Sequence, residues 1–148
     1  MIRFIVFLIL NFGALGLGAF LMGSNPGENQ WYQELNKAPW TPPGWVFGAA
    51  WTLIMVSYSV FLTVSYNSNE KLVFLILFAA QWLLNVFWNP LFFKYHLTQI
   101  AFLEISLLFG VLLNYLLLVR GYRIIFLLPY VIWLVIAISL NGYVILKN

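Results

Sequence analysis

Five long apolar runs constrain this chain more than any other feature. They fall at residues 4–22, 45–64, 72–93, 100–119 and 124–146. A hydrocarbon core of about 30 Å takes about 20 helical residues to cross, and each run has about that length. The chain is 64% hydrophobic and 7% charged, which is too apolar for a soluble domain. The sequence therefore predicts an all-α, multi-pass integral membrane protein with a five-transmembrane-helix bundle in one domain, 1–148. The helices are expected over about 3–23, 43–65, 70–93, 98–119 and 123–146.

Residue content excludes several classes of site. The chain has no Cys and a single His, His96, so disulfides, thiolate metal sites and histidine clusters are not expected. We therefore predict neither a metal nor a cofactor. The net charge of +3 suits contact with anionic membrane lipid, but no basic cluster is dense enough to indicate nucleic acid. Lys and Arg number four on the N-terminal side and three on the other, a slight preference for a cytoplasmic N-terminus.

The longest connecting segment carries an unusual stretch, "LNKAPWTPPGWVFGAAW" (35–51). Pro39 and Pro42 each bias the residue before them away from helix, whereas Pro43 suits a first helical turn. Proline and aromatic residues lower the entropy lost on ordering, unlike the Gly/Ser composition of a flexible tether. The sequence predicts an ordered lid over about 24–42.

Polar side chains recur on one face of two predicted helices. Gln81, Asn85, Trp88 and Phe92 fall at i, i+4, i+7 and i+11, and the fifth run places Trp133, Ala137, Leu140 and Asn141 at i, i+4, i+7 and i+8. An amide that faces lipid tails leaves its hydrogen bonds unmade. We therefore predict that both faces, and Asn85 in particular, point into the bundle.

The first run contains small residues four apart, Ala14 with Gly18 and Ala19 with Gly23. This spacing lets helix backbones approach closely. It predicts tight packing, either on a helix of the same chain or on a second subunit.

Four sequence elements together resemble one known family. They are "W-Y-x-x-L-x-K-x-P-W-x-P-P" (31–43), Trp51, "L-N-x-x-W-x-P-L-F-F" (84–93), and "P-Y-x-x-W" followed by "A-x-x-L-N" (129–141). In order and spacing they are similar to the translocator protein, or tryptophan-rich sensory protein, family, also known as TspO/MBR or the peripheral benzodiazepine receptor. The resemblance covers nearly the whole chain and is to the bacterial type.

The resemblance implies a five-helix bundle, a homodimer in a bacterial cell membrane, and a cavity covered by the first loop. Its ligands would be tetrapyrroles such as protoporphyrin IX and haem-like molecules, benzodiazepine-site drugs and steroids, and its role would be a receptor in porphyrin sensing or homeostasis. Carried over by motif, the ligand-binding residues are Tyr32, Trp40, Pro42, Trp51, Asn85, Trp88, Trp133 and Ala137.

Several alternatives stay open at the level of sequence. Trp51, Trp88 and Trp133 are either cavity walls or core packing, and Glu104 is either a functional carboxyl or a side chain that joins two helices. No conventional catalytic motif is visible, and the resemblance implies at most a light-dependent breakdown of porphyrin through Trp51 and Trp133. Transport of a tetrapyrrole or sterol is the alternative to binding.

Overall fold

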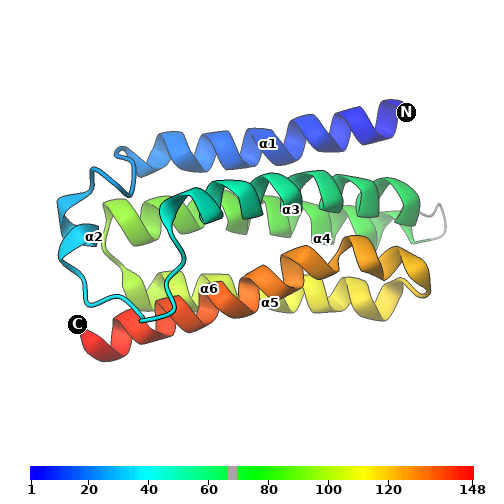
Figure 1. Cartoon of the computed structure of the whole chain (residues 1–148). Helices are drawn as coiled ribbons and strands as arrows, with labels where there is room; N and C mark the ends of the chain where they lie inside the picture. Colours follow the sequence, from blue (N-terminus) through cyan, green and yellow to red (C-terminus); the bar gives the residue numbers. More distant parts are fainter. Residues whose placement is uncertain (67–69) are drawn as a thin grey trace.

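The computed structural model describes residues 1–66 and 70–148, which fold into a helical bundle (Figure 1). Within this described part, five helices are long and apolar enough to cross a membrane. A short helix lies in the first loop, a π-helical turn (η1) follows the third long helix, and a 3-10 turn (η2) precedes the last. In chain order the elements are α1 (Ile2–Met22), α2 (Gln30–Glu34), α3 (Gly44–Ser65), α4 (Lys71–Asn89), η1 (Pro90–Lys94), α5 (Thr98–Leu118), η2 (Tyr122–Phe126) and α6 (Leu128–Lys147).

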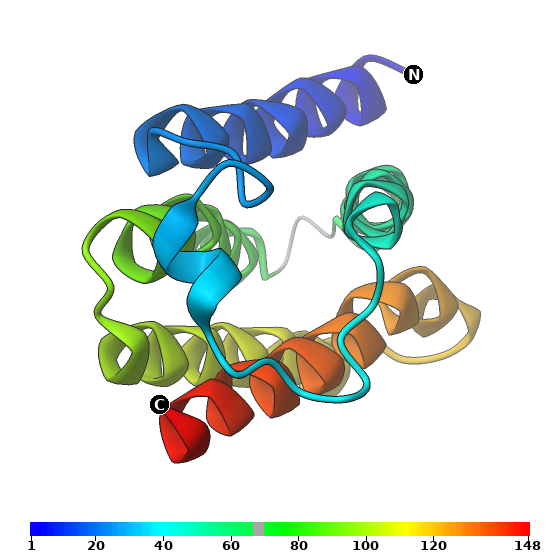
Figure 2. The same ribbon diagram turned by 60° about the vertical axis from the view of Figure 1, so that its left-hand side comes forward.

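The five long helices form a closed ring. α1 packs against α3 and α4, α5 packs against α4 and α6, and α6 packs against α3 (Figure 2). The 23–43 loop crosses one end of this ring, here called the loop end, and the N-terminus lies at the opposite end (Figures 1 and 2). Because the helices alternate in direction along the chain, α1 and α4 are the single pair of ring neighbours that run in parallel.

The interior towards the opposite end is built from aromatic rings. Tyr58, Phe61, Phe74, Tyr115 and Tyr130 are all buried and contact one another edge-on or stacked. The Tyr115 hydroxyl donates to the Phe74 carbonyl oxygen at 3.0 Å, which satisfies a polar group that hydrocarbon would leave unpaired. Apolar side chains such as those of Ile9, Leu103 and Leu117 instead point outward, where lipid is the expected solvent.

α1 is held to its two neighbours by specific contacts. Asn11 donates to the Ser59 hydroxyl of α3 at 2.8 Å, and the Trp82 indole of α4 donates to the Leu10 carbonyl at 2.9 Å. A Cβ on Gly18 would lie 3.1 Å from the Val86 carbonyl oxygen of α4. The small residue therefore packs on a helix of the same chain, the first of the two alternatives that the spacing allowed.

Two helix ends differ from the expected bounds. The expected 123–146 helix is divided, because a 3-10 turn over Tyr122–Phe126 precedes α6, which begins at Leu128. Pro129 lacks an N–H and fits the first turn of a helix, so it sets this start. The expected 70–93 helix changes to a π-turn at Pro90, where the Tyr95 amide donates to the Pro90 carbonyl oxygen at 2.9 Å.

Candidate ligand site beneath the 23–43 loop

The 23–43 loop begins where Gly23 ends α1. Gly23 has a φ of 87°, a left-handed conformation that glycine adopts without steric cost. Six residues later Asn29 caps α2, since its Oδ1 accepts from the Tyr32 amide at 2.9 Å. Its Nδ2 donates to the Phe93 carbonyl oxygen at 2.9 Å. One side chain thus starts α2 and attaches it to η1.

The second half of the loop is attached to α6. The Asn36 backbone N–H donates to the Asn148 side-chain oxygen at 2.9 Å, and the Trp40 indole donates to the Ser139 hydroxyl at 3.1 Å. These hydrogen bonds are exposed. The loop is therefore ordered by a few bonds that can open without unfolding the helices.

Aromatic side chains lie directly beneath α2. Tyr32 packs edge-on against Phe92 and Phe93, and Trp31 packs against Phe92 and stacks on His96 with ring centres 4.1 Å apart. Burial raises the pKa of the Tyr32 phenol above its ordinary value. The phenol therefore stays neutral at physiological pH.

The polar face of α4 points into the bundle, as predicted. Gln81 and Asn85 are buried, with 1% and 4% of their surface exposed. Trp88 is half-buried and stacks on Phe92 with ring centres 5.2 Å apart. Gln81 donates to the Tyr130 hydroxyl at 3.0 Å.

The opposite wall comes from α3 and α6. Trp51 is half-buried and packs edge-on against Tyr130, with ring centres 5.8 Å apart. Trp133 is buried and packs edge-on against Phe47, with ring centres 5.3 Å apart. Ala137, one turn after Trp133, lies against the same core.

Several buried polar atoms at this end have no hydrogen-bond partner in the described part of the chain. They are Asn85 Nδ2, Trp88 Nε1, both amide atoms of Asn141, and Glu104 Oε2. Unpaired buried groups of this kind are costly, and native proteins keep few of them. These atoms lie on the inner faces of α4, α5 and α6, and each can form a hydrogen bond with water or with a polar group of a ligand.

Glu104 belongs to the same level of the bundle as Asn85. The hydrogen bond between Tyr115 and Phe74 sets the register of the antiparallel pair α5 and α4. Asn85 follows Phe74, and Glu104 precedes Tyr115, by the same number of residues, about three helical turns in each case. Helix geometry therefore puts the two side chains at one height, each on the face that α4 and α5 share.

One predicted ligand residue, Trp40, lies apart from this interior. Trp40 is 54% exposed and packs edge-on against Tyr143 on the outside of α6. Pro42 is half-buried just before α3. Tyr32 and Trp88 lie against one apolar cluster under the loop, whereas Trp51, Trp88 and Ala137 lie against a second cluster that contains Trp133. Trp88 is the residue common to both.

The predicted ligand-binding set lacks four residues that the structure places here: Phe47, Tyr130, Phe92 and Asn141. Of these, Phe92 and Asn141 lie on the two faces that the sequence predicts to point into the bundle. Spacing contained a signal for each. Phe47 lies one turn before Trp51, Asn141 one turn after Ala137, and Phe92 one turn after Trp88. Tyr130 lies one turn before Leu134 on the inward face of α6.

A five-helix membrane bundle with an aromatic, partly polar interior and a structured loop across one end defines the class of this protein. The TspO/MBR family model matches residues 4–146, so the chain belongs to that family.

Relatives from different domains of life agree with this assignment. The chain is 33% identical over 120 residues to a tryptophan-rich sensory protein of Cereibacter sphaeroides, covering 76% of this chain and 73% of that protein. It is 31% identical over 126 residues to the tryptophan-rich protein TspO of Archaeoglobus fulgidus, covering 80% of each. It is 34% identical over 120 residues to the translocator protein of Ovis aries, covering 76% of this chain and 71% of that protein. The protein is therefore a multi-pass integral membrane protein of this family.

Proposed function

We propose that the protein is a membrane receptor that binds a tetrapyrrole of the protoporphyrin IX class, or another planar apolar ligand, beneath the 23–43 loop. The observation that carries the proposal is the combination of aromatic walls with buried, unpaired polar atoms at the loop end. Trp51, Trp88 and Trp133 supply the flat apolar surfaces. Asn85 and Asn141 supply the free amides.

This combination matches the chemistry of a planar macrocycle. Aromatic faces stack on such a ligand at low entropic cost, since the rings are rigid. A few polar groups in an otherwise apolar pocket fix its orientation. In an apolar surrounding the amides gain more from a ligand than they would in water, because water competes less for their hydrogen bonds.

Binding in this place requires the loop to move. Trp31 and Tyr32 pack on the aromatic rings of η1, and Phe47 packs on Trp133. A macrocycle that enters from the loop end reaches the interior only when these contacts open. Loop opening is therefore a step of the proposed binding, and loops that act as lids come from the less stable parts of a fold.

The first prediction concerns the stability of the 23–43 loop. Asn29→Ala removes both the cap of α2 and the bond to Phe93, so amide exchange in residues 24–42 is expected to accelerate by about tenfold, from the loss of about 1–2 kcal/mol. Hydrogen exchange with mass spectrometry measures this directly. Saturating protoporphyrin is expected to slow the exchange of the wild-type loop.

Gln30→Ala is the matched control, since the exposed Gln30 side chain donates to Glu34 within α2. It is expected to leave exchange outside α2 near the wild-type rate. Unchanged loop exchange at saturating porphyrin would contradict the lid.

The second prediction concerns the role of Asn85 in stability and in ligand binding. Asn85→Leu removes a buried amide whose Nδ2 has no partner in the described residues. The free protein is expected to keep or gain stability, by up to about 1–3 kcal/mol, because an unpaired buried group disappears. Protoporphyrin affinity is expected to fall, and quenching of tryptophan fluorescence measures it.

Asn11→Leu is the control for Asn85. It removes an amide that donates a hydrogen bond to Ser59 of α3. The stability of the free protein is therefore expected to fall, while its affinity for protoporphyrin stays constant. Loss of stability without loss of affinity in Asn85→Leu would assign Asn85 to packing.

A chain of contacting rings favours light-dependent porphyrin breakdown as a second candidate function. Ring centres are 5.8 Å apart for Trp51 and Tyr130, 5.4 Å for Tyr130 and Tyr58, and 6.3 Å for Tyr58 and Tyr115. Tryptophan and tyrosine are the side chains that carry radicals most readily, and this row leads away from the ligand site. Illuminated protein with bound porphyrin and oxygen would form products that a dark sample lacks, and Trp51→Phe would suppress them.

A homodimer is part of the same proposal. Gly13 and Gly16 of α1 are exposed, and a Cβ on either meets nothing within 4 Å among described residues. This outward face of α1 offers a second copy a close helix approach, as small residues do in membranes. Native mass spectrometry in detergent would count the subunits, and Gly16→Leu is expected to reduce the dimer.

A further inference from the structure

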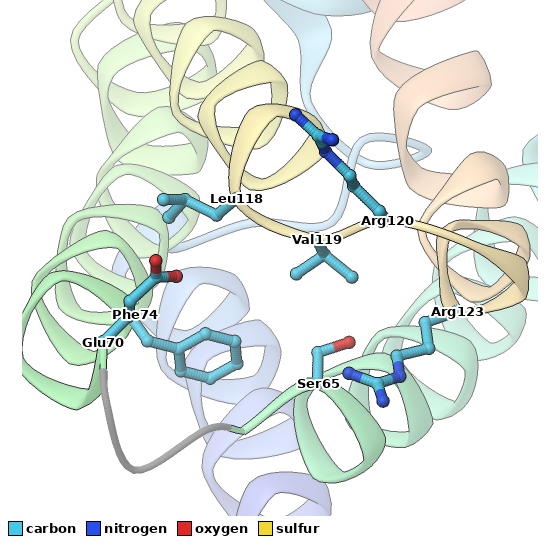
Figure 3. A pocket seen from close by; sticks show the side chains of 7 residues that line it. All are labelled: Ser65, Glu70, Phe74, Leu118, Val119, Arg120 and Arg123. Atoms are coloured by element: carbon cyan, nitrogen blue, oxygen red, sulfur yellow. The ribbon is translucent and has the colours of Figure 1, made fainter.

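A cavity of about 60 Å³ lies at the end of the bundle opposite the loop (Figure 3). One water molecule needs about 10–15 Å³, so the cavity has room for more than one. It is distinct from the candidate ligand site, which lies at the other end. Its lining residues are Ser65, Glu70, Phe74, Leu118, Val119, Arg120 and Arg123.

Ser65 differs from the other helical hydroxyls. Ser59, Thr63 and Ser106 each donate to the carbonyl oxygen four residues earlier in their own helix. Ser65 is 4% exposed, yet its Oγ has no partner within residues 1–66 and 70–148. Figure 3 shows this hydroxyl directed into the space between Val119 and Arg123. A buried hydroxyl turned away from its own backbone points to a ligand in the cavity.

The charge around the cavity is positive. Arg123 extends toward Ser65, and Arg120 stands at the rim with its guanidinium turned outward (Figure 3). The carboxylate of Glu70 lies toward Leu118, away from Arg123 (Figure 3). Both arginines are exposed, whereas Arg3, at the same end, lies over the Tyr66 ring at 4.9 Å. Within residues 1–66 and 70–148 both guanidiniums are therefore exposed and open to an anion.

We propose that Ser65 and Arg123 bind a phosphoryl group in this cavity, and that Arg120 at the rim adds positive charge beside it. Arginine binds phosphate oxygens through paired, charge-assisted hydrogen bonds, and the serine hydroxyl donates a further bond from the cavity floor. The cavity lies at a helix end, level with lipid headgroups, so an anionic phospholipid is one source of this group. Soluble phosphate is the other source, and the two are distinguished by experiment.

The test uses purified full-length protein and native mass spectrometry. Phosphatidylglycerol and phosphatidylcholine of equal chain length are the lipid probes, and inorganic phosphate is added as competitor. Wild-type protein is expected to retain phosphatidylglycerol in preference to phosphatidylcholine. Arg120→Gln/Arg123→Gln is expected to lower this retention by about tenfold or more, and Ser65→Ala by about threefold to tenfold, the range of charged and neutral hydrogen bonds.

Lys94→Gln is the matched control, because Lys94 is an exposed basic residue at the loop end. It is expected to retain the lipid as the wild type does. Equal losses in Lys94→Gln and the double arginine variant would overturn the site in favour of general attraction between charges. Wild-type retention by Ser65→Ala would also overturn it. Displacement of the lipid by millimolar phosphate would identify the phosphoryl group itself as the determinant, whereas selective retention in its presence assigns the site to the lipid headgroup.

Discussion

Trp51→Phe is expected to weaken protoporphyrin binding by about tenfold to a hundredfold, since truncating an aromatic platform commonly costs about 1–3 kcal/mol. Trp51 is half-buried on α3 and meets Tyr130 edge-on. Phenylalanine keeps most of this packing but removes the indole N–H and part of the flat surface. Thermal stability is therefore expected to change little. Fluorescence quenching by added porphyrin gives the affinity, and unfolding in detergent gives the stability.

Two other tryptophans serve as controls. Trp45, on the same helix, is 75% exposed, so Trp45→Phe is expected to leave both quantities unchanged. The Trp82 indole bonds Leu10, so Trp82→Phe is expected to lower stability and spare affinity. If Trp51→Phe behaves like Trp82→Phe, Trp51 packs the core and does not touch ligand.

Gly18→Val is expected to destabilise the bundle by about 1–3 kcal/mol, the usual cost of overpacking an interior. A Cβ at Gly18 would lie 2.8 Å from Asn89 Nδ2 and 3.1 Å from the Val86 carbonyl oxygen. The amide is the end of a side chain and can move, but the carbonyl belongs to the α4 backbone. Valine therefore forces α1 and α4 apart. Thermal unfolding in detergent, monitored as the loss of soluble protein, measures the effect.

Gly110→Val, in the middle of α5, is the matched control for Gly18→Val. A Cβ on Gly110 meets nothing within 4 Å in the described residues, and valine carries the same intrinsic helix penalty at both positions. The difference between the two variants therefore isolates the contact between α1 and α4. Equal losses of stability would mean that the close approach contributes nothing.

The number of helices and the inward direction of their polar faces follow from the sequence. A segment that crosses hydrocarbon must satisfy its own backbone and hide its amides, and these demands act on each helix separately. The five apolar runs and the buried positions of Gln81 and Asn85 could be predicted for this reason. The prolines of the 23–43 loop predict that it is ordered. Pro129 likewise indicates where α6 starts.

Only the tertiary structure decided which helices become neighbours. Every long helix here is apolar around most of its surface, so hydropathy does not distinguish the side that meets another helix from the side that meets lipid. The contact of Gly18 with α4, the outward position of Trp40 and the cavity beside Ser65 depend on residues far apart in the chain. The sequence by itself determined five membrane helices, a stiff loop and the types of side chain available for a site. The close packing of those helices in a ring decided where these side chains meet, because such contacts form only when separate segments fit together.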